Sequence, residues 1–223
     1  MARHRRWFGP AAALAALAAC GALWGGPGRA LAAAPVEYRP DPGASRIQVH
    51  VDKKGLLSGL AHDHHFAATA WRATARLDPA SGAPGAIDVV VEAGSLRDQQ
   101  PALSAGDREK VDRQAAQSLE ALHYPEVRFT GDGPLRPAEG AAPAGADGAL
   151  SGLLDGRLAL HGRERPVAVP LRAEREGDGW RVRGTFSLRQ SDFGIEPFSG
   201  FLGTISVHDE VRIELDLLLI PAG

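Results

Sequence analysis

Cysteine is almost absent from this chain: Cys20 is the only one in 223 residues. It lies in the N-terminal segment, so neither a disulfide framework nor thiol chemistry is expected in the rest of the protein. Long apolar runs are also scarce. The longest, residues 11–23, is too short to span about 30 Å of hydrocarbon as a stable anchor.

Catalytic signatures are missing as well. The sequence has no G-x-S-x-G elbow, no phosphate-binding glycine loop and no H-E-x-x-H pair. Ser, His and Asp all occur, but no spacing links them as nucleophile, base and orienting group. On these grounds we do not expect an enzyme.

The first 32 residues have the order of a secretory signal peptide. Arg3, Arg5 and Arg6 form a basic start, the apolar run follows, and residues 30–32 supply the A-x-A pattern of small residues. Cleavage after Ala32 would leave a domain of residues 33–223 in the periplasm or outside the cell.

A lipoprotein signal is the alternative for the same segment. Residues 17–20 (Leu-Ala-Ala-Cys) resemble a lipobox, whose cysteine would be lipidated and become the new N-terminus. Against this, residues 21–24 remain apolar. Membrane contact is expected only if Cys20 is lipidated.

Removal of residues 1–32 changes the net charge. That segment holds four of the 25 basic residues and none of the 27 acidic residues, so the remainder carries −6 with histidine neutral. A surface of this sign repels nucleic acid and anionic membranes, and we expect neither as a partner.

Strict alternation of apolar and polar residues predicts a chain built mainly of strands. The clearest case is the C-terminal segment, where the odd-numbered residues of 205–217 are nearly all apolar and the even-numbered ones polar. Eight strands are predicted: Ser45–Lys53, His64–Leu77, Ala86–Glu92, Glu126–Thr130, Leu153–His161, Val167–Arg175, Trp180–Arg189 and Ile205–Leu217. Turns such as 162–166 and 177–179 join several of them.

One helix and one loop interrupt the strands. Ser104 followed by Asp107 predicts a helix start, the apolar residues 111, 115, 119 and 122 recur at helical spacing, and Tyr124-Pro125 ends the helix. Residues 131–149 are rich in Gly, Ala and Pro and predict a flexible loop. Eight half-buried antiparallel strands fit a sandwich or a closed barrel, and periodicity alone does not choose between them.

Four motifs in chain order resemble the YceI-like family. They are Tyr38 with Asp41-Pro42, Ser45 and Ile47; the step ALHYPEVRF at residues 121–129; the hairpin LALHGRERPV at 158–167; and RQSDFGI at 189–195. The resemblance covers residues 38 to about 219. Two departures from the family pattern are leucines in place of a Phe-Phe pair near residue 120, and the His-rich stretch 55–66 with its H-D-H sequence, which resembles a subgroup of the family.

The resemblance implies an all-β fold: an eight-stranded antiparallel lipocalin-like barrel with one helix between early strands. It also implies a non-enzymatic carrier for a long apolar ligand, an isoprenoid lipid or a quinone, held in the barrel interior, with no required cofactor. A homodimer is compatible with the family, and the sequence shows no partner face.

The candidate ligand site follows from this interpretation. The residues expected to line the tunnel or its mouth are Phe66, Trp71, Phe129, Leu158, Leu160, Phe186, Phe193, Phe198, Phe201 and Ile205. Arg189 and Asp192 are the candidates for contact with a polar head group, with a rim salt bridge as the ordinary alternative. Ala159 is expected to be a small inward residue.

The histidines leave a second interpretation open. His62 and His64 lie two residues apart, so on a strand they share a face and could bind a divalent metal ion if a third ligand joins them. A polar tunnel rim is the simpler reading. The functional alternatives to a carrier are therefore a metal-binding protein or metal-dependent enzyme centred on His62 and His64, and a filled-core scaffold barrel acting in envelope stress response.

Overall fold

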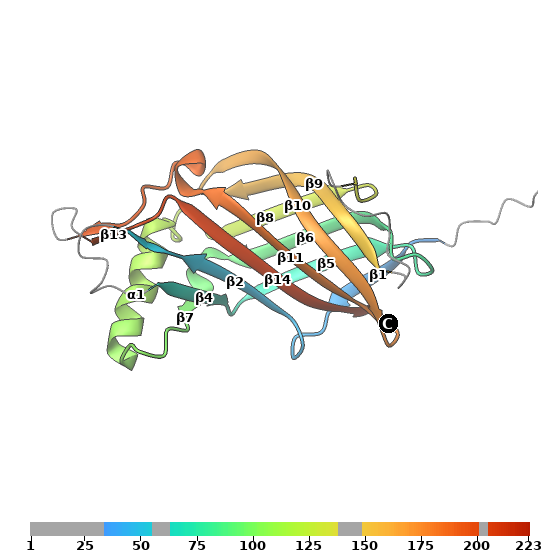
Figure 1. Cartoon of the computed structure of the whole chain (residues 1–223), viewed down its shortest axis with the longest axis horizontal. Helices are drawn as coiled ribbons and strands as arrows, with labels where there is room; N and C mark the ends of the chain where they lie inside the picture. The colour runs from blue at the N-terminus through green and yellow to red at the C-terminus, as the bar shows by residue number, and fades with distance from the viewer. Residues whose placement is uncertain (1–33, 55–62, 138–148, 201–204) are drawn as a thin grey trace, which may run out of the picture. The chain divides into compact units, whose positions relative to one another are not determined.

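The computed structural model describes residues 34–54, 63–137, 149–200 and 205–223. Within these ranges the structure is mostly strand, with one α-helix and two 3-10 turns (Figure 1). The strands are β1 (Val36–Pro40), β2 (Arg46–Val51), β3 (Lys53–Lys54), β4 (His64–Ala68), β5 (Trp71–Leu77), β6 (Pro84–Glu92), β7 (Leu96–Asp98), β8 (Glu126–Asp132), β9 (Leu150–Leu160), β10 (Arg163–Glu176), β11 (Gly179–Arg189), β12 (Ser199–Gly200), β13 (Ile205–Val207) and β14 (Glu210–Pro221). The helix is α1 (Ala105–Ser118), and the 3-10 turns are η2 (Ala93–Ser95) and η3 (Gln190–Phe193).

Eight antiparallel strands close into a barrel, as predicted. The ring runs β1-β5-β6-β8-β9-β10-β11-β14 and returns to β1. β14 also pairs with β2, which continues to β4 and β7 on the wall next to α1. Closure satisfies the hydrogen-bonding groups that a sheet edge would expose.

One of the eight strands that form the ring, β1, differs from the prediction. β1 was not predicted, because five residues with a proline at the end carry little alternation; it is held by pairing with β5 and β14. The predicted strand His64–Leu77 is divided into β4 and β5 at Thr69-Ala70, where Thr69 N donates to Ser95 O. The predicted strand Ile205–Leu217 is likewise two strands, β13 and β14, separated by His208-Asp209.

The β9–β10 hairpin is tighter than predicted. Its turn consists of His161 and Gly162, both with positive φ (52° and 70°), and Pro166 lies within β10 and not in a loop. Positive φ at two central residues suits the twist of a two-residue hairpin. β9 and β10 are consequently longer than the predicted strands.

The helix begins where predicted and ends earlier. Ser104 is the N-cap, and its Oγ accepts a hydrogen bond from Asp107 N at 3.2 Å. The helix stops at Ser118, since Leu119 caps it and Glu120 turns the chain with φ 45°. The prediction that Leu122 belongs to the apolar helix face is wrong, because Leu122 lies in this turn and is 98% exposed.

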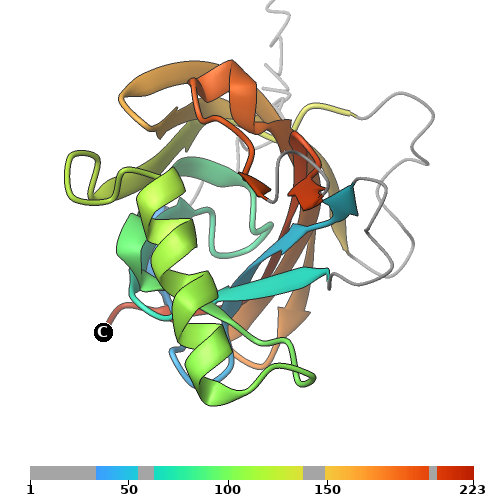
Figure 2. The ribbon, with the colours of Figure 1, turned by 90° about the vertical axis from the view of Figure 1, so that its left-hand side faces the viewer.

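The helix crosses one end of the barrel. Figure 2 shows α1 in front of the barrel end, and Figure 1 places the chain's C-terminus at the opposite end. α1 contacts β7 and η2, next to β4. In the predicted loop 131–149, β8 extends to Asp132 and Arg136 pairs with Leu153; residues 138–148 lie outside the described part of the chain. No helix among the described residues is long and apolar enough to cross a membrane.

Two glycines make room for an aromatic ring inside the barrel. Gly131 and Gly156 pair across β8 and β9, and a methyl group on Gly156 would lie 2.5 Å from both the Phe129 ring and Thr130 O. We expect Gly156→Ala to lower the free energy of unfolding by about 1–3 kcal/mol, because neither the ring nor the main chain has space to move.

Gly106→Ala is the matched control, since nothing lies within 4 Å of a methyl group at this position in α1. Its stability should be unchanged or slightly raised. Urea unfolding of both variants checks the expectation, and a Gly156→Ala protein as stable as wild type would show that the Phe129 ring is not confined there.

Candidate functional site

The barrel encloses a cavity of about 550 Å³. Aliphatic side chains form most of its wall because the inward-facing residues of each strand alternate with polar outward-facing ones. This size lies within the range of about 300–1,000 Å³ that is usual for small-molecule sites. The strand residues that line it include Ile47, Ala75, Val89, Leu154, Val169, Val182, Ile213 and Leu217.

The two ends of the cavity differ. Trp180, at the start of β11, is 3% exposed and packs against Gly82 in the β5–β6 turn, which fills the end opposite α1. At the other end, α1 turns one face toward the space, with Val111, Ala115 and Leu119 in the wall. None of the residues of α1 is buried, since the helix covers a hollow and not a packed core.

Polar side chains in the wall gather at the α1 end. His64 from β4, Gln114 and Lys110 from α1, and Gln190 from η3 contribute there, together with Ser118. Asp98 connects β4 with α1, because its side chain contacts His64 of β4 and its main-chain N–H donates to Asp112 of α1. Thr74 on β5 also borders the cavity, but it alternates with the inward residues Ala73 and Ala75 and is exposed.

Most predicted aromatic and aliphatic site residues lie in this wall. Those that line the cavity are Phe66, Phe129, Leu158, Leu160, Phe186 and Phe198. Phe198 is also 38% exposed, so it reaches from the cavity toward solvent. Phe201 and the side chain of Ile205 lie outside the described residues.

Three placements differ from expectation. Trp71 is inward but packs against the core cluster beside the cavity without lining it. Phe193, which was expected at a mobile mouth of the cavity, is 2% exposed. It belongs to η3 and packs with Leu160 in a buried cluster. Ala159 faces outward, because its neighbours Leu158 and Leu160 are the inward residues of β9.

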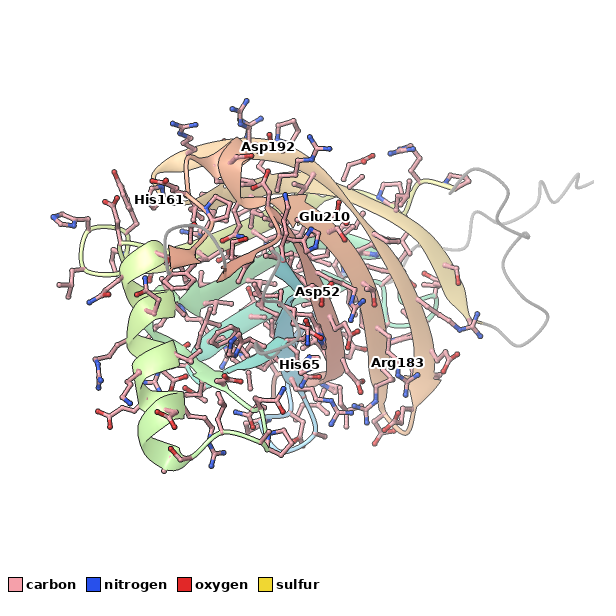
Figure 3. The ribbon with its side chains drawn as sticks, turned by 60° about the vertical axis from the view of Figure 1, so that its left-hand side comes forward. Asp52, His65, His161, Arg183, Asp192 and Glu210 are labelled. Carbon is pink, nitrogen blue, oxygen red and sulfur yellow. The ribbon has the colours of Figure 1, made fainter. Side chains whose placement is uncertain are left out.

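The head-group candidates lie outside the cavity. Arg189 follows Leu188, which lines the cavity, so its side chain has the opposite direction and is exposed. Asp192 at η3 and Glu210 at the start of β14 are both exposed, and Figure 3 labels the two residues. Arg189, Asp192 and Glu210 border a small depression on the outer surface, together with Ser187. The structure thus separates Arg189 and Asp192 from the apolar site.

The histidines are divided between the two faces of the sheet. His64 points inward, with its Nδ1 2.7 Å from Asp98 Oδ2, whereas His65 points outward and its Nδ1 lies 2.6 Å from His50 Nδ1. His62 lies outside the described residues. Among residues 34–54, 63–137, 149–200 and 205–223, no group of three or more His, Cys, Asp or Glu side chains could hold a metal ion, and the metal site stays a prediction.

The contribution of the helix to the cavity wall was not predicted from the sequence. Val111 and Ala115 were recognised only as a helical pattern, although Lys110, Gln114 and Ser118 share the cavity-facing side with them. The signal available was the combination of small, apolar and uncharged polar residues at spacings of three and four. It does not tell whether such a face covers a packed core or a cavity.

Asp209 holds η3 against the start of β14. Its carboxylate accepts hydrogen bonds from Ser191 Oγ at 2.6 Å and Ser191 N at 2.8 Å. These bonds, with the Ser191 hydroxyl first, lower the pKa of Asp209 below its ordinary value of 3.8. Because η3 carries Phe193 and precedes Ile195, this contact supports one wall of the cavity end.

We expect Asp209→Asn to destabilise the protein by no more than about 1 kcal/mol at neutral pH, because solvent screens this contact. A carboxyl whose pKa is lowered by folding stabilises the protein above its unfolded pKa and loses this contribution as pH falls through its folded pKa. The difference in melting temperature between wild type and variant should therefore be constant from about pH 5 to 7 and shrink below 3.8.

Asp178→Asn, an exposed position in the β10–β11 turn, is the control. Thermal unfolding of the three proteins across this pH range makes the comparison. A wild-type advantage over Asp209→Asn that persisted unchanged far below pH 3.8 would contradict the role of the charge.

Comparison with known proteins identifies the class. The model of the YceI-like domain matches residues 38–219, and the chain belongs to this family. Among curated proteins, no significant sequence match was found.

Solved structures agree with the fold. BcnA of Burkholderia cenocepacia superposes with a TM-score of 0.58 at 21% identity, over 80% of this chain and 98% of that one. A domain from Saccharophagus degradans, described as a polyisoprenoid binding domain implicated in plant cell wall breakdown, gives 0.59 at 14% identity, over 84% and 99%. The predicted barrel and family are both confirmed.

Proposed function

We propose that this protein is a non-enzymatic carrier that holds one long apolar ligand, an isoprenoid lipid or a quinone, in the barrel cavity. The observation that carries the proposal is a cavity of about 550 Å³ whose wall is apolar except near α1. The YceI-like family membership and the fold shared with a polyisoprenoid binding domain support the same function.

The energetics favour a ligand made of a hydrocarbon chain. Burial of one methylene contributes about 0.8 kcal/mol, so a five-carbon isoprene unit contributes roughly 3–4 kcal/mol before costs. Ordering a flexible chain offsets much of this gain, and affinity therefore does not follow from chain length alone. An apolar wall with few hydrogen-bonding groups suits such a chain better than a polar metabolite.

The ligand would enter at the α1 end. Trp180 and the β5–β6 turn fill the opposite end, whereas α1 has no buried residue and Phe198 extends from the cavity wall to solvent. Displacement of a helix that rests on a hollow loses little buried apolar area, so this end has the smaller barrier to opening.

The proposed location of this carrier is the periplasm or the cell exterior. Residues 1–32 would act as the export signal, with cleavage after Ala32, and lipidation of Cys20 is the alternative that would attach the protein to a membrane. N-terminal sequencing or intact mass of the exported protein distinguishes these two forms.

A pair of matched substitutions tests the proposal. Ala73 lines the cavity from β5, whereas Ala159 on β9 faces outward, and both are half-buried. Ala73→Phe should reduce the affinity for geranylgeraniol at least about tenfold, because the ring occupies ligand volume. Ala159→Phe should leave the affinity within a factor of about two.

Isothermal titration calorimetry on delipidated protein measures both affinities, and circular dichroism confirms that each variant is folded. Equal affinities in the two variants would contradict a binding site inside the barrel. Failure of the wild-type protein to bind any isoprenoid alcohol or quinone would contradict the carrier function.

A further inference from the structure

The ionisable side chains in the cavity wall are of one chemical kind. Among the described lining residues only His64 and Lys110 are ionisable, and both are basic in type. No described carboxylate lines the cavity. A wall of this composition suits a ligand whose polar end is acidic better than one whose polar end is basic.

His64 is held in a defined orientation. It projects inward from β4 on the same face as Phe66 and Ala68. Its Nδ1 lies 2.7 Å from Oδ2 of Asp98, whose side chain is fully buried, and the other oxygen of Asp98 accepts from Gln100 N at 2.8 Å. A buried carboxylate needs such donors, so the Nδ1 proton faces Asp98.

This arrangement leaves Nε2 as the nitrogen of His64 that a ligand can reach. Within the described ranges of the chain, none of the hydrogen bonds or ion pairs engages Nε2, and the side chain is 21% exposed. Because Asp98 fixes the ring through Nδ1, the position of Nε2 is set before any ligand arrives. Such preorganisation lowers the entropic cost of binding.

His64 also lies at the end where the other polar lining groups gather. The main-chain N–H of Asp98 donates to Asp112 of α1 at 2.7 Å, which places the His64–Asp98 pair beside this helix. Lys110, Gln114 and Ser118 lie on the cavity-facing side of α1. The remainder of the wall, toward Trp180, is apolar.

We propose that His64, positioned by Asp98, binds an acidic end group of the apolar ligand, a phosphate or a carboxylate, at the α1 end of the cavity. This inference rests on the carrier function proposed above and adds to it the chemical class of the ligand's head. The hydrocarbon chain then extends toward Trp180, and the charged end stays next to the opening.

The chemistry is a proton-mediated ion pair. An oxygen of the acid group and Nε2 share one proton in an N–H···O contact, which is stronger than the contact an alcohol oxygen makes there because the acid group can carry a charge. Asp98 compensates the positive charge from the other side of the ring. Lys110 adds a second cation at the rim, although its Nζ is paired with Asp107 at 2.8 Å.

Two matched pairs of probes test the proposal by calorimetry on the whole delipidated protein. Geranylgeranyl monophosphate is compared with geranylgeraniol, and palmitate with hexadecanol, so that each pair differs only in the end group. Wild type should bind at least one acidic probe about tenfold or more tightly than its alcohol. Which pair shows the preference distinguishes a phosphate from a carboxylate.

His64→Leu should reduce this preference to less than about twofold, with the alcohols bound within about threefold of wild type. Lys110→Met, which removes the other cation, should keep most of the preference. In wild-type protein labelled with 15N-histidine, the Nε2 resonance of His64 should move on addition of the preferred acidic probe and not of its alcohol. This last measurement does not depend on how well a variant folds.

The outcomes separate the two proposals. Equal binding of acids and alcohols by wild type, or a preference that survives His64→Leu, would overturn the role of His64 while leaving the carrier function intact. Loss of the preference in Lys110→Met but not in His64→Leu would also overturn it. Absence of binding by all four probes would overturn the role of His64, and absence of binding by a quinone as well would overturn both proposals.

Discussion

The short pairing between β1 and β14 is the constraint on which the rest of the structure depends. Three residue pairs, from Tyr38 with Pro221 to Pro40 with Leu219, join the last strand of the chain to the first and turn an open sheet into a ring. Once the ring is closed, each alternating strand must turn its apolar residues inward. The circumference of eight strands exceeds what these side chains fill, and a cavity of about 550 Å³ is left.

The ends of the barrel then acquire different roles. At the β1 end, Trp180 and the β5–β6 turn complete a packed layer with Tyr38 and Leu219. At the other end, β2, β4 and β7 continue the sheet from β14 and form part of the wall, and α1 covers the opening. The polar groups of the lining are found beside this cover, so the barrel presents an apolar interior with one polar end. That asymmetry matches an amphiphile, whose chain requires burial and whose head requires hydrogen bonds.

Much of the fold could be predicted from the sequence because alternation is a local signal. It identified the inward faces of β8, β9 and β11, and with them Phe129, Leu158 and Phe186. The same parity excludes Arg189 and Ala159 from the cavity, so these two predictions conflicted with evidence already present in the sequence. Two other features depended on distant parts of the chain. β1 exists through its partners, and Asp98 reaches His64 across 34 positions, a pairing that no local pattern reveals.

The central claim is that the cavity holds an apolar ligand, and native mass spectrometry of the purified protein tests it most directly. Organic extraction after unfolding then identifies whatever is released. The account predicts one isoprenoid lipid or quinone per chain, present after purification or taken up on incubation with polyprenyl lipids. A mass that remains that of the bare chain after both treatments would contradict it.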